Sequence, residues 1–345
     1  MKRMREITVF LSNRQTPGSF QEALQKFISK RHRKGLSDYS VIHLYNSLYP
    51  MGLELKNPQM TDLTPQKVKG YVDRLWLKYA PGTMRPIIGD LKQFLAWCKK
   101  KGYTGKNLGS RLTKPRPRRI TSKAAREADV AAVMSLLAGL LTHRVYRDLF
   151  GNLVHDAAAN WSEAEILAIR DLFAVVFLYE TGGRARELTQ LGTKVMERAC
   201  QTPAAAYTVT SIGKTNDRDL RFTDNTAELW RIWSAVRPHE CDYALYSLRP
   251  THPAGPLTSN GLSQILVRRC NEAGVPVFRS HALRHAKVRR ARRLVGLEIA
   301  SLLIDHSSVE MTRNYANVDD GELSEAVVKT GLQRDIWHKK DGEKL

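Results

Sequence analysis

Four short segments in the second half of the chain carry side chains that can bind and cleave a phosphate ester. Arginine and lysine neutralise phosphate oxygens, histidine transfers protons near neutral pH, and a tyrosine hydroxyl can attack phosphorus. The segments are TGGRAREL at 181–188 with Arg184, GKTNDR at 213–218 with Lys214, HALRH at 281–285 with His281 and Arg284, and DHSSVEMTRNY at 305–315 with His306 and Tyr315.

Two of these arginines and the tyrosine suit cleavage of a phosphate ester through a covalent intermediate. Tyr315 has the hydroxyl that such an ester needs, but the ordinary tyrosine pKa of ~10 keeps it protonated at neutral pH unless cations or a proton acceptor lie nearby. Arg184 and Arg284 can hold both non-bridging oxygens and stabilise the charge of a phosphorane-like transition state. A covalent ester of this kind conserves the energy of the broken bond.

The sequence predicts no metal and no cofactor. Its paired carboxylates, Asp217 with Asp219 and Asp319 with Asp320, are not spaced for two divalent ions, so we expect them to be solvated. No G-x-x-x-x-G-K-[ST] motif is present that would cradle a nucleotide phosphate. The four cysteines are widely separated and form no C-x-x-C pair, which indicates reduced core thiols rather than a zinc site or a disulfide framework.

Taken in order, these segments resemble the active-site signature of the tyrosine recombinase (phage integrase) family. The first resembles T-G-x-R-x-x-E-L, in which Glu187 and Leu188 fill supporting positions. The next two resemble G-K-x-x-x-R and H-x-L-R-H, and the last is similar to G-H-S-S-x-x-x-T-x-x-Y. Asp305 stands where the family usually has Gly, and Arg186 is a second candidate for the first catalytic arginine.

The resemblance implies a role for each of the six residues. Tyr315 is the nucleophile, which forms a 3′-phosphotyrosine with the cut strand, and Arg184 and Arg284 bind the scissile phosphate. The remaining three act on protons and hydrogen bonds: Lys214 is the general acid for the departing 5′ oxygen, His281 assists proton transfer, and His306 hydrogen-bonds the phosphate.

The first third of the chain predicts a helical domain with a basic face. Apolar residues at helical spacing over 19–101 predict four helices. The resemblance implies that they form a core-binding domain at 17–105, which follows a basic segment at 1–16. Residues 1–120 hold 25 basic and 7 acidic residues, a net charge of +18, whereas the whole chain carries +21. Charge concentrated in this way favours a polyanionic partner.

The rest of the chain predicts a linker and a catalytic domain. Proline and arginine in RLTKPRPRRITSK indicate an extended linker at 106–123. The resemblance implies a catalytic domain at 124–320 after it, and a final apolar set predicts a C-terminal helix and tail at 321–345. Residues 142–162 show no clear period. Helices are expected at 124–141, 163–179, 225–236, 259–273, 282–295 and 297–304, with Gly296 as a helix end, and strands at 206–211 and 219–223 form a hairpin that carries Lys214.

The expected fold is therefore mainly α with a small β-sheet. The resemblance implies a two-domain C-shaped clamp, in which a helical core-binding domain and an α/β tyrosine-recombinase catalytic domain close around double-stranded DNA. The stretch KVRRARR at 287–293 is expected to add contacts to the DNA backbone.

The resemblance implies a site-specific DNA recombinase that serves integration, excision or resolution of a mobile element. Its expected partners are double-stranded DNA, a homotetramer on two DNA sites with exchanged C-terminal helices, and an accessory DNA-bending protein; the alternative is that the C-terminal helix packs on its own domain. We expect no membrane association and a cytoplasmic, nucleoid-associated location, because no apolar stretch reaches the roughly 18–20 residues of a bilayer span. The rival functions are a type IB topoisomerase-like enzyme that relaxes DNA and a catalytically silent DNA-binding accessory protein.

Overall fold

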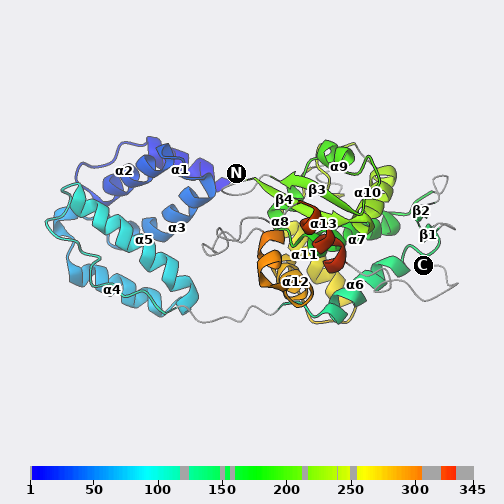
Figure 1. The fold of residues 1–345 in the computed structure, drawn as a ribbon. Helices are drawn as coiled ribbons and strands as arrows, with labels where there is room; N and C mark the ends of the chain where they lie inside the picture. Colours follow the sequence, from blue (N-terminus) through cyan, green and yellow to red (C-terminus); the bar gives the residue numbers. More distant parts are fainter. Residues whose placement is uncertain are drawn as a thin grey trace. The chain divides into compact units, whose positions relative to one another are not determined.

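The computed structural model divides the chain into two compact units, Met1–Ile120 and Thr121–Leu345 (Figure 1). Each unit has its own hydrophobic core. The structure describes residues 2–116, 124–147, 152–155, 160–211, 217–238, 240–248, 255–304 and 320–331.

The first unit is a bundle of α-helices around an aromatic core. The rings of Phe20 and Phe27 pack edge-on against Phe94, with centroids 5.2 and 5.4 Å apart. Side-chain oxygens of Ser19, Ser37 and Thr64 accept backbone N–H groups at the starts of α2, α3 and α4, which fixes where these helices begin. The described helices are α1 (Lys2–Ser12), α2 (Phe20–Arg33), α3 (Asp38–Glu54), α4 (Pro65–Trp76) and α5 (Pro81–Lys100), with a 3₁₀ turn at Met60–Asp62.

The four helices predicted over 19–101 are confirmed as α2 to α5, but two segments differ from expectation. The segment 1–16, set apart as a basic segment, contains α1, whose Ile7 and Phe10 are buried in the bundle core. Residues 106–116 of the expected linker pack along α5, because Leu108 joins the core and Lys92 donates a hydrogen bond to the Leu112 carbonyl. Buried apolar side chains in both segments explain the difference.

The second unit is mostly helical and is built around α7. This helix begins at a capping box between Ser162 and Glu165, and it is buried on every side from residue 168 to residue 181. The unit comprises α6 (Glu127–Gly139), α7 (Glu163–Thr181), α8 (Ala185–Thr189), α9 (Thr193–Ala199), α10 (Asp224–Val236), α11 (Ser259–Glu272), α12 (Ser280–Leu303), α13 (Asp320–Thr330) and strands β1 (Val145–Arg147), β2 (Leu153–His155), β3 (Ala206–Ser211) and β4 (Arg218–Thr223).

The strands form two antiparallel pairs, which confirms the predicted mainly helical fold with a small sheet. In the predicted hairpin, β3 pairs with β4 from Ala206 opposite Thr223 to Ser211 opposite Arg218. The stretch 142–162, which shows no period in the sequence, contains β1 and β2; the backbone N–H of Leu153 donates to a buried carboxylate of Glu228. Such short strands depend on tertiary contacts, so their alternation is too brief to read.

The predicted helix end at Gly296 is confirmed as a break inside α12. Gly296 has φ +83, a conformation that favours glycine, and α12 continues to Leu303 beyond it. The C-terminal helix α13 packs against α12 and the β3–β4 hairpin of the same chain, beside α12 in Figure 1. Within the described ranges, none of the helices combines the length and apolar character that a bilayer crossing demands.

Candidate active site

A tight turn at the end of α7 presents the first predicted arginine. Gly182 ends the helix in the left-handed region, with φ +59, and a Cβ there would lie 2.9 Å from Ile304 Cγ2, so the position requires glycine. The Thr181 hydroxyl donates to the Phe177 carbonyl and accepts the Gly183 N–H at 2.9 Å. The turn is thereby fixed, and Arg184 follows it at the start of α8.

Glu187 holds Arg184 by both its backbone and its side chain. The buried Glu187 carboxylate accepts the Arg184 backbone N–H at 2.7 Å and the Arg184 Nη1 at 2.7 Å. Half of the Arg184 side chain remains exposed, so its guanidinium is accessible to a ligand. A charge-assisted contact of this length orients a guanidinium before substrate arrives.

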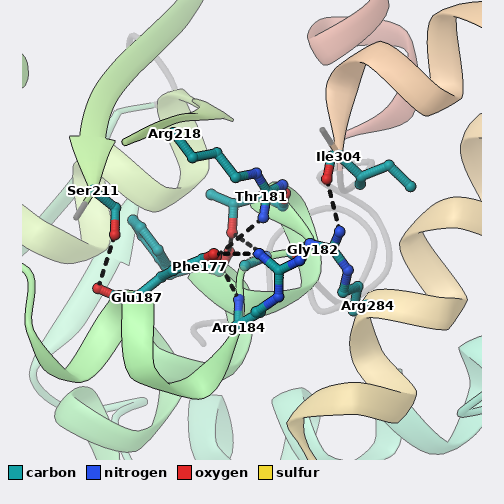
Figure 2. A network of polar contacts seen from close by, with 10 residues as sticks. Phe177, Thr181, Gly182, Arg184, Glu187, Ser211, Arg218, Arg284 and Ile304 are labelled. Carbon is teal, nitrogen blue, oxygen red and sulfur yellow. Dashed lines mark hydrogen bonds and ion pairs between the residues drawn. The ribbon is translucent and has the colours of Figure 1, made fainter. Parts of the chain in front are cut away.

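The β3–β4 hairpin is joined to the same carboxylate. Arg218 at the start of β4 is buried, and its Nη1 donates to Glu187 Oε2 at 3.0 Å. Its register partner Ser211 donates to the Glu187 carbonyl at 3.5 Å (Figure 2). Lys214 lies between these two residues in the sequence and outside the described residues; the hairpin base from which it extends is therefore anchored beside Arg184.

The second predicted arginine, Arg284 of α12, reaches the Gly182 turn from another part of the chain. Its Nη1 donates to the Gly182 carbonyl and its Nη2 to the Ile304 carbonyl, both at 2.7 Å, and the residue is 3% exposed. Figure 2 shows Arg184 and Arg284 on either side of this turn. The fold thus brings together two guanidiniums from segments far apart in the sequence.

Two histidines share the first turns of α12 with Arg284. His281 is exposed and lies three residues before Arg284, on the same helical face. Its ring packs edge-on against His285, with centroids 4.7 Å apart. Burial, together with the neighbouring His281 and the positive charges of Arg284 and Arg289, lowers the pKa of His285, which favours the neutral imidazole.

Three of the six predicted site residues, Lys214, His306 and Tyr315, lie outside the described residues. The structure places the flanks of their segments. Ile304 precedes the segment with His306 and Tyr315, and its carbonyl is held by Arg284. The hairpin base and the start of this segment therefore both lie at the Gly182 turn.

The structure distinguishes Arg184 from its neighbour Arg186. Arg184 is next to the Gly182 turn and is bound by Glu187, whereas the Arg186 Nε donates to Gln190 Oε1 on the exposed side of α8 at 3.0 Å. The contact with Gln190 directs Arg186 away from the Glu187 carboxylate. Of the two arginines, Arg184 is therefore the one held beside the Gly182 turn and Arg284.

Sequence reasoning missed two residues of this site, although both stand inside the motifs. Arg218 ends GKTNDR and supports Glu187 from the hairpin, and His285 ends HALRH and packs on His281. The position of each residue at the end of a motif was the sequence signal that could have indicated its part in the site.

A second candidate surface lies on the first unit, at the C-terminal ends of α2 and α5. Lys30, Lys34 and Lys101 lie close enough that the positive charges of Lys101 and Lys34, with those of Lys100 and Arg33, lower the pKa of Lys30. Phe27 and Trp97 line a hollow of about 420 Å³ beside Lys30 and Lys34. We call Lys30, Arg33, Lys34, Lys100 and Lys101 the α2–α5 basic surface.

Known proteins resemble this chain in sequence and in fold. The chain matches the phage integrase family over residues 149–322, half of its length. It is 27% identical over 263 residues to tyrosine recombinase XerC of Mycobacterium leprae (strain TN), covering 71% of this chain and 77% of that protein.

Two solved structures share the fold at low sequence identity. A lambda integrase (75–356) dimer bound to a COC′ core site superposes with a TM-score of 0.60 at 14% identity, covering 87% of this chain and 95% of that one. The XerH site-specific recombinase bound to difH substrate gives a TM-score of 0.59 at 15% identity, covering 91% of this chain and 86% of that one. With its fold, its paired arginines and this family match, the chain belongs to the phage integrase family.

Proposed function

We propose that this protein is a site-specific DNA recombinase that cuts and rejoins DNA through a 3′-phosphotyrosine intermediate. The observation that carries the proposal is the convergence of Arg184 and Arg284 on the Gly182 turn. Two guanidiniums held beside one turn can together bind a phosphate and stabilise the charge of its transition state. The family membership supplies the chemical class.

The proposed reaction assigns each bond and proton to a residue. The Tyr315 hydroxyl attacks the phosphorus held by Arg184 and Arg284, and its proton passes toward His281. The bond from phosphorus to the 5′ oxygen breaks, and Lys214 protonates that oxygen. His306 hydrogen-bonds the phosphate. A 5′ hydroxyl from the partner strand then attacks the ester, releases Tyr315 and reverses the proton transfers.

We also propose an assembly and a place of action. The two units close around duplex DNA as a C-shaped clamp, and four protomers hold two DNA sites, with an accessory protein bending the DNA. A lambda integrase tetramer bound to a Holliday junction, which shares the fold with a TM-score of 0.60 at 13% identity, supports this stoichiometry. In the tetramer we propose that α13 is exchanged, so that the site where α13 packs on each catalytic domain holds the α13 of a neighbouring protomer in place of its own. The enzyme acts in the cytoplasm on nucleoid DNA.

The test of this function is trapping of the covalent intermediate. A duplex selected by the protein from a random-sequence pool is nicked beside the cleavage point, so that the cut fragment diffuses away. In buffer that contains a metal chelator, the wild-type protein should form a covalent protein–DNA adduct, seen as a band on a denaturing gel. Absence of that band on every selected duplex would contradict the proposed chemistry.

Supercoiled plasmids with zero, one or two selected sites separate the rival functions. A recombinase should yield resolved or inverted product only with two sites. Relaxation that is independent of the number of sites would instead identify a topoisomerase. DNA binding with no covalent band and no product would identify an accessory protein.

Replacing part of the α2–α5 basic surface should reduce the salt dependence of DNA binding. Each phosphate contact contributes about 0.9 to the slope of log K against log salt concentration, so the double variant Lys30→Ala/Lys34→Ala should lower the slope by roughly 1.8. Fluorescence anisotropy over a salt series measures this slope. The matched control is Lys69→Ala/Lys78→Ala, which removes two exposed lysines from another part of the same unit. If the slope of Lys30→Ala/Lys34→Ala equals the wild-type slope, as expected for the control, the α2–α5 basic surface does not face DNA.

A further inference from the structure

The basic stretch KVRRARR is not a uniform DNA-contacting face, because two of its cations point into the protein. Lys287 and Arg290 are 2% and 7% exposed, and both Arg290 and Arg293 donate to Glu127 of α6. Arg289 and Arg292 are exposed. A buried lysine is rare without a specific partner, so Lys287 requires an explanation within the fold.

The partner of Lys287 is the last turn of α13. Its Nζ donates to the Thr330 carbonyl at 3.0 Å and to the Thr330 hydroxyl at 2.7 Å, and Thr330 is fully buried. The carbonyls of a final helical turn have no partners within the helix and carry partial negative charge, which an ammonium group satisfies. Lys287 therefore binds the C-terminal end of α13.

The next residue shows how closely this end of α13 fits its seat. A Cβ built at Gly331 would lie 2.5 Å from Thr223 Cγ2 of β4 and 3.5 Å from Glu180 Oε1 of α7. The Glu180 carboxylate also accepts the hydroxyls of Thr223 and Thr226 at 2.6 and 2.8 Å. Elements α7, β4 and α12 together thus form a shaped seat for one helix end.

The same lysine touches the active-site turn. A Cβ at Gly182 would lie 3.4 Å from Lys287 Cγ, and Arg284, one turn earlier on α12, binds the carbonyls of Gly182 and Ile304. One face of α12 therefore holds the Gly182 turn, the end of its own helix at Ile304 and the last turn of α13. A shift of α13 would change the surroundings of all three.

The electrostatics make the seat depend on its occupant. Burial lowers the pKa of Lys287 to about 8, while the Glu180 carboxylate opposes this shift and Arg290 adds to it. If α13 leaves, the ammonium group loses both Thr330 acceptors, and hydrogen bonds to a charged group are stronger than bonds between neutral groups. The charged lysine therefore favours the docked position of α13.

We propose that Lys287 is a positioning residue, which seats the last turn of α13 and thereby sets the geometry of the Gly182 turn and its arginines. The effect on cleavage rests on the proposed function, because it requires a DNA-cleaving site at that turn. The seating of α13 does not, and it can be measured without DNA.

Three single variants of the full chain test the proposal. Lys287→Met keeps an unbranched side chain that is one heavy atom shorter, removes the charge and loses both hydrogen bonds. Thr330→Val keeps the shape of threonine without its hydroxyl. Thr330→Ser keeps the hydroxyl and is the matched control. Amide hydrogen exchange of peptides from 324–330 reports the seating of α13, and covalent-adduct formation on the nicked duplex reports cleavage.

We expect exchange to rise on the order of tenfold in Thr330→Val and more in Lys287→Met, as for loss of hydrogen bonds to a charged group. Adduct formation should slow in the same order at unchanged DNA affinity, while Thr330→Ser stays near wild type in both measurements. The double variant Lys287→Met/Thr330→Val should exchange only slightly faster than Lys287→Met, because the second change then removes only the bond from the Thr330 hydroxyl to the Ala326 carbonyl.

Unchanged exchange in both Lys287→Met and Thr330→Val would overturn the seat itself. Faster exchange with unchanged adduct formation would overturn the positioning role. If the wild-type protein forms no adduct, the proposed function fails, and hydrogen exchange still decides whether Lys287 seats α13.

Discussion

Replacing Tyr315 by phenylalanine is expected to abolish covalent attachment to DNA while leaving DNA binding unchanged. The substitution removes one oxygen and keeps the ring, so only the attacking atom is lost. Loss of a nucleophile costs on the order of 10⁴ to 10⁶ in rate, which would place adduct formation below detection. The measurement is the yield of protein–DNA band on the nicked duplex against time.

The control for this variant is a tyrosine that the site does not use. Tyr146 on β1 is 48% exposed, so Tyr146→Phe should keep wild-type adduct yield. Equal anisotropy titrations for both variants would show that binding is intact. An adduct that persists in Tyr315→Phe would assign the nucleophile to another residue.

Replacing Arg184 by alanine is expected to slow cleavage by roughly 100- to 1,000-fold, as does removal of one oxyanion-binding donor in other enzymes. Arg184 lies beside the Gly182 turn and half of its side chain is exposed to a ligand, whereas Arg186 is directed toward Gln190. Arg186→Ala should therefore remain within a few-fold of wild type. Single-turnover adduct formation at saturating protein compares the two rates.

This pair of variants also controls for charge, because each removes one cation from the same short segment. Their DNA affinities should be similar, so a large difference in rate would report transition-state stabilisation. If Arg184→Ala forms the adduct at the wild-type rate and Arg186→Ala forms none, the first catalytic arginine is Arg186 and not Arg184.

The parts of the fold that the sequence predicts well are those with long hydrophobic periods. The helices around Phe20, Phe94 and Phe173 repeat their apolar residues over three or more turns, and they are present in the structure. The hairpin at 206–223 was readable from two alternating runs around a Gly/Asn/Asp turn.

Elements with weak local signals were not predictable. In α1, Met4, Ile7 and Phe10 are spaced as in a helix, but the surrounding charge led to the prediction of a basic segment at 1–16 without a helix. The strands β1 and β2 have three residues each and depend on contacts such as that of Leu153 with Glu228. Long-range partners determine such segments, and a sequence pattern does not contain them.

The same distinction applies to the candidate site. Motif spacing indicated Arg184, His281 and Arg284, and the structure places the two arginines at one turn. Motif spacing could not indicate that Arg218 supports Glu187. It also could not indicate that Lys287 is buried against Thr330 while Arg289 and Arg292 of KVRRARR are exposed. A run of basic residues has no internal signal for which of them turns inward. Lys214, His306 and Tyr315 remain predictions from the sequence.

The most direct test of the account is to identify the residue that carries the DNA. The wild-type adduct is digested with nuclease and trypsin, and the modified peptide is sequenced by mass spectrometry. The account predicts a nucleotide attached through its 3′ phosphate to Tyr315, in the tryptic peptide 314–329 that follows Arg313 and ends at Lys329. A nucleotide linked through its 5′ phosphate, or attached to any other side chain, would contradict it.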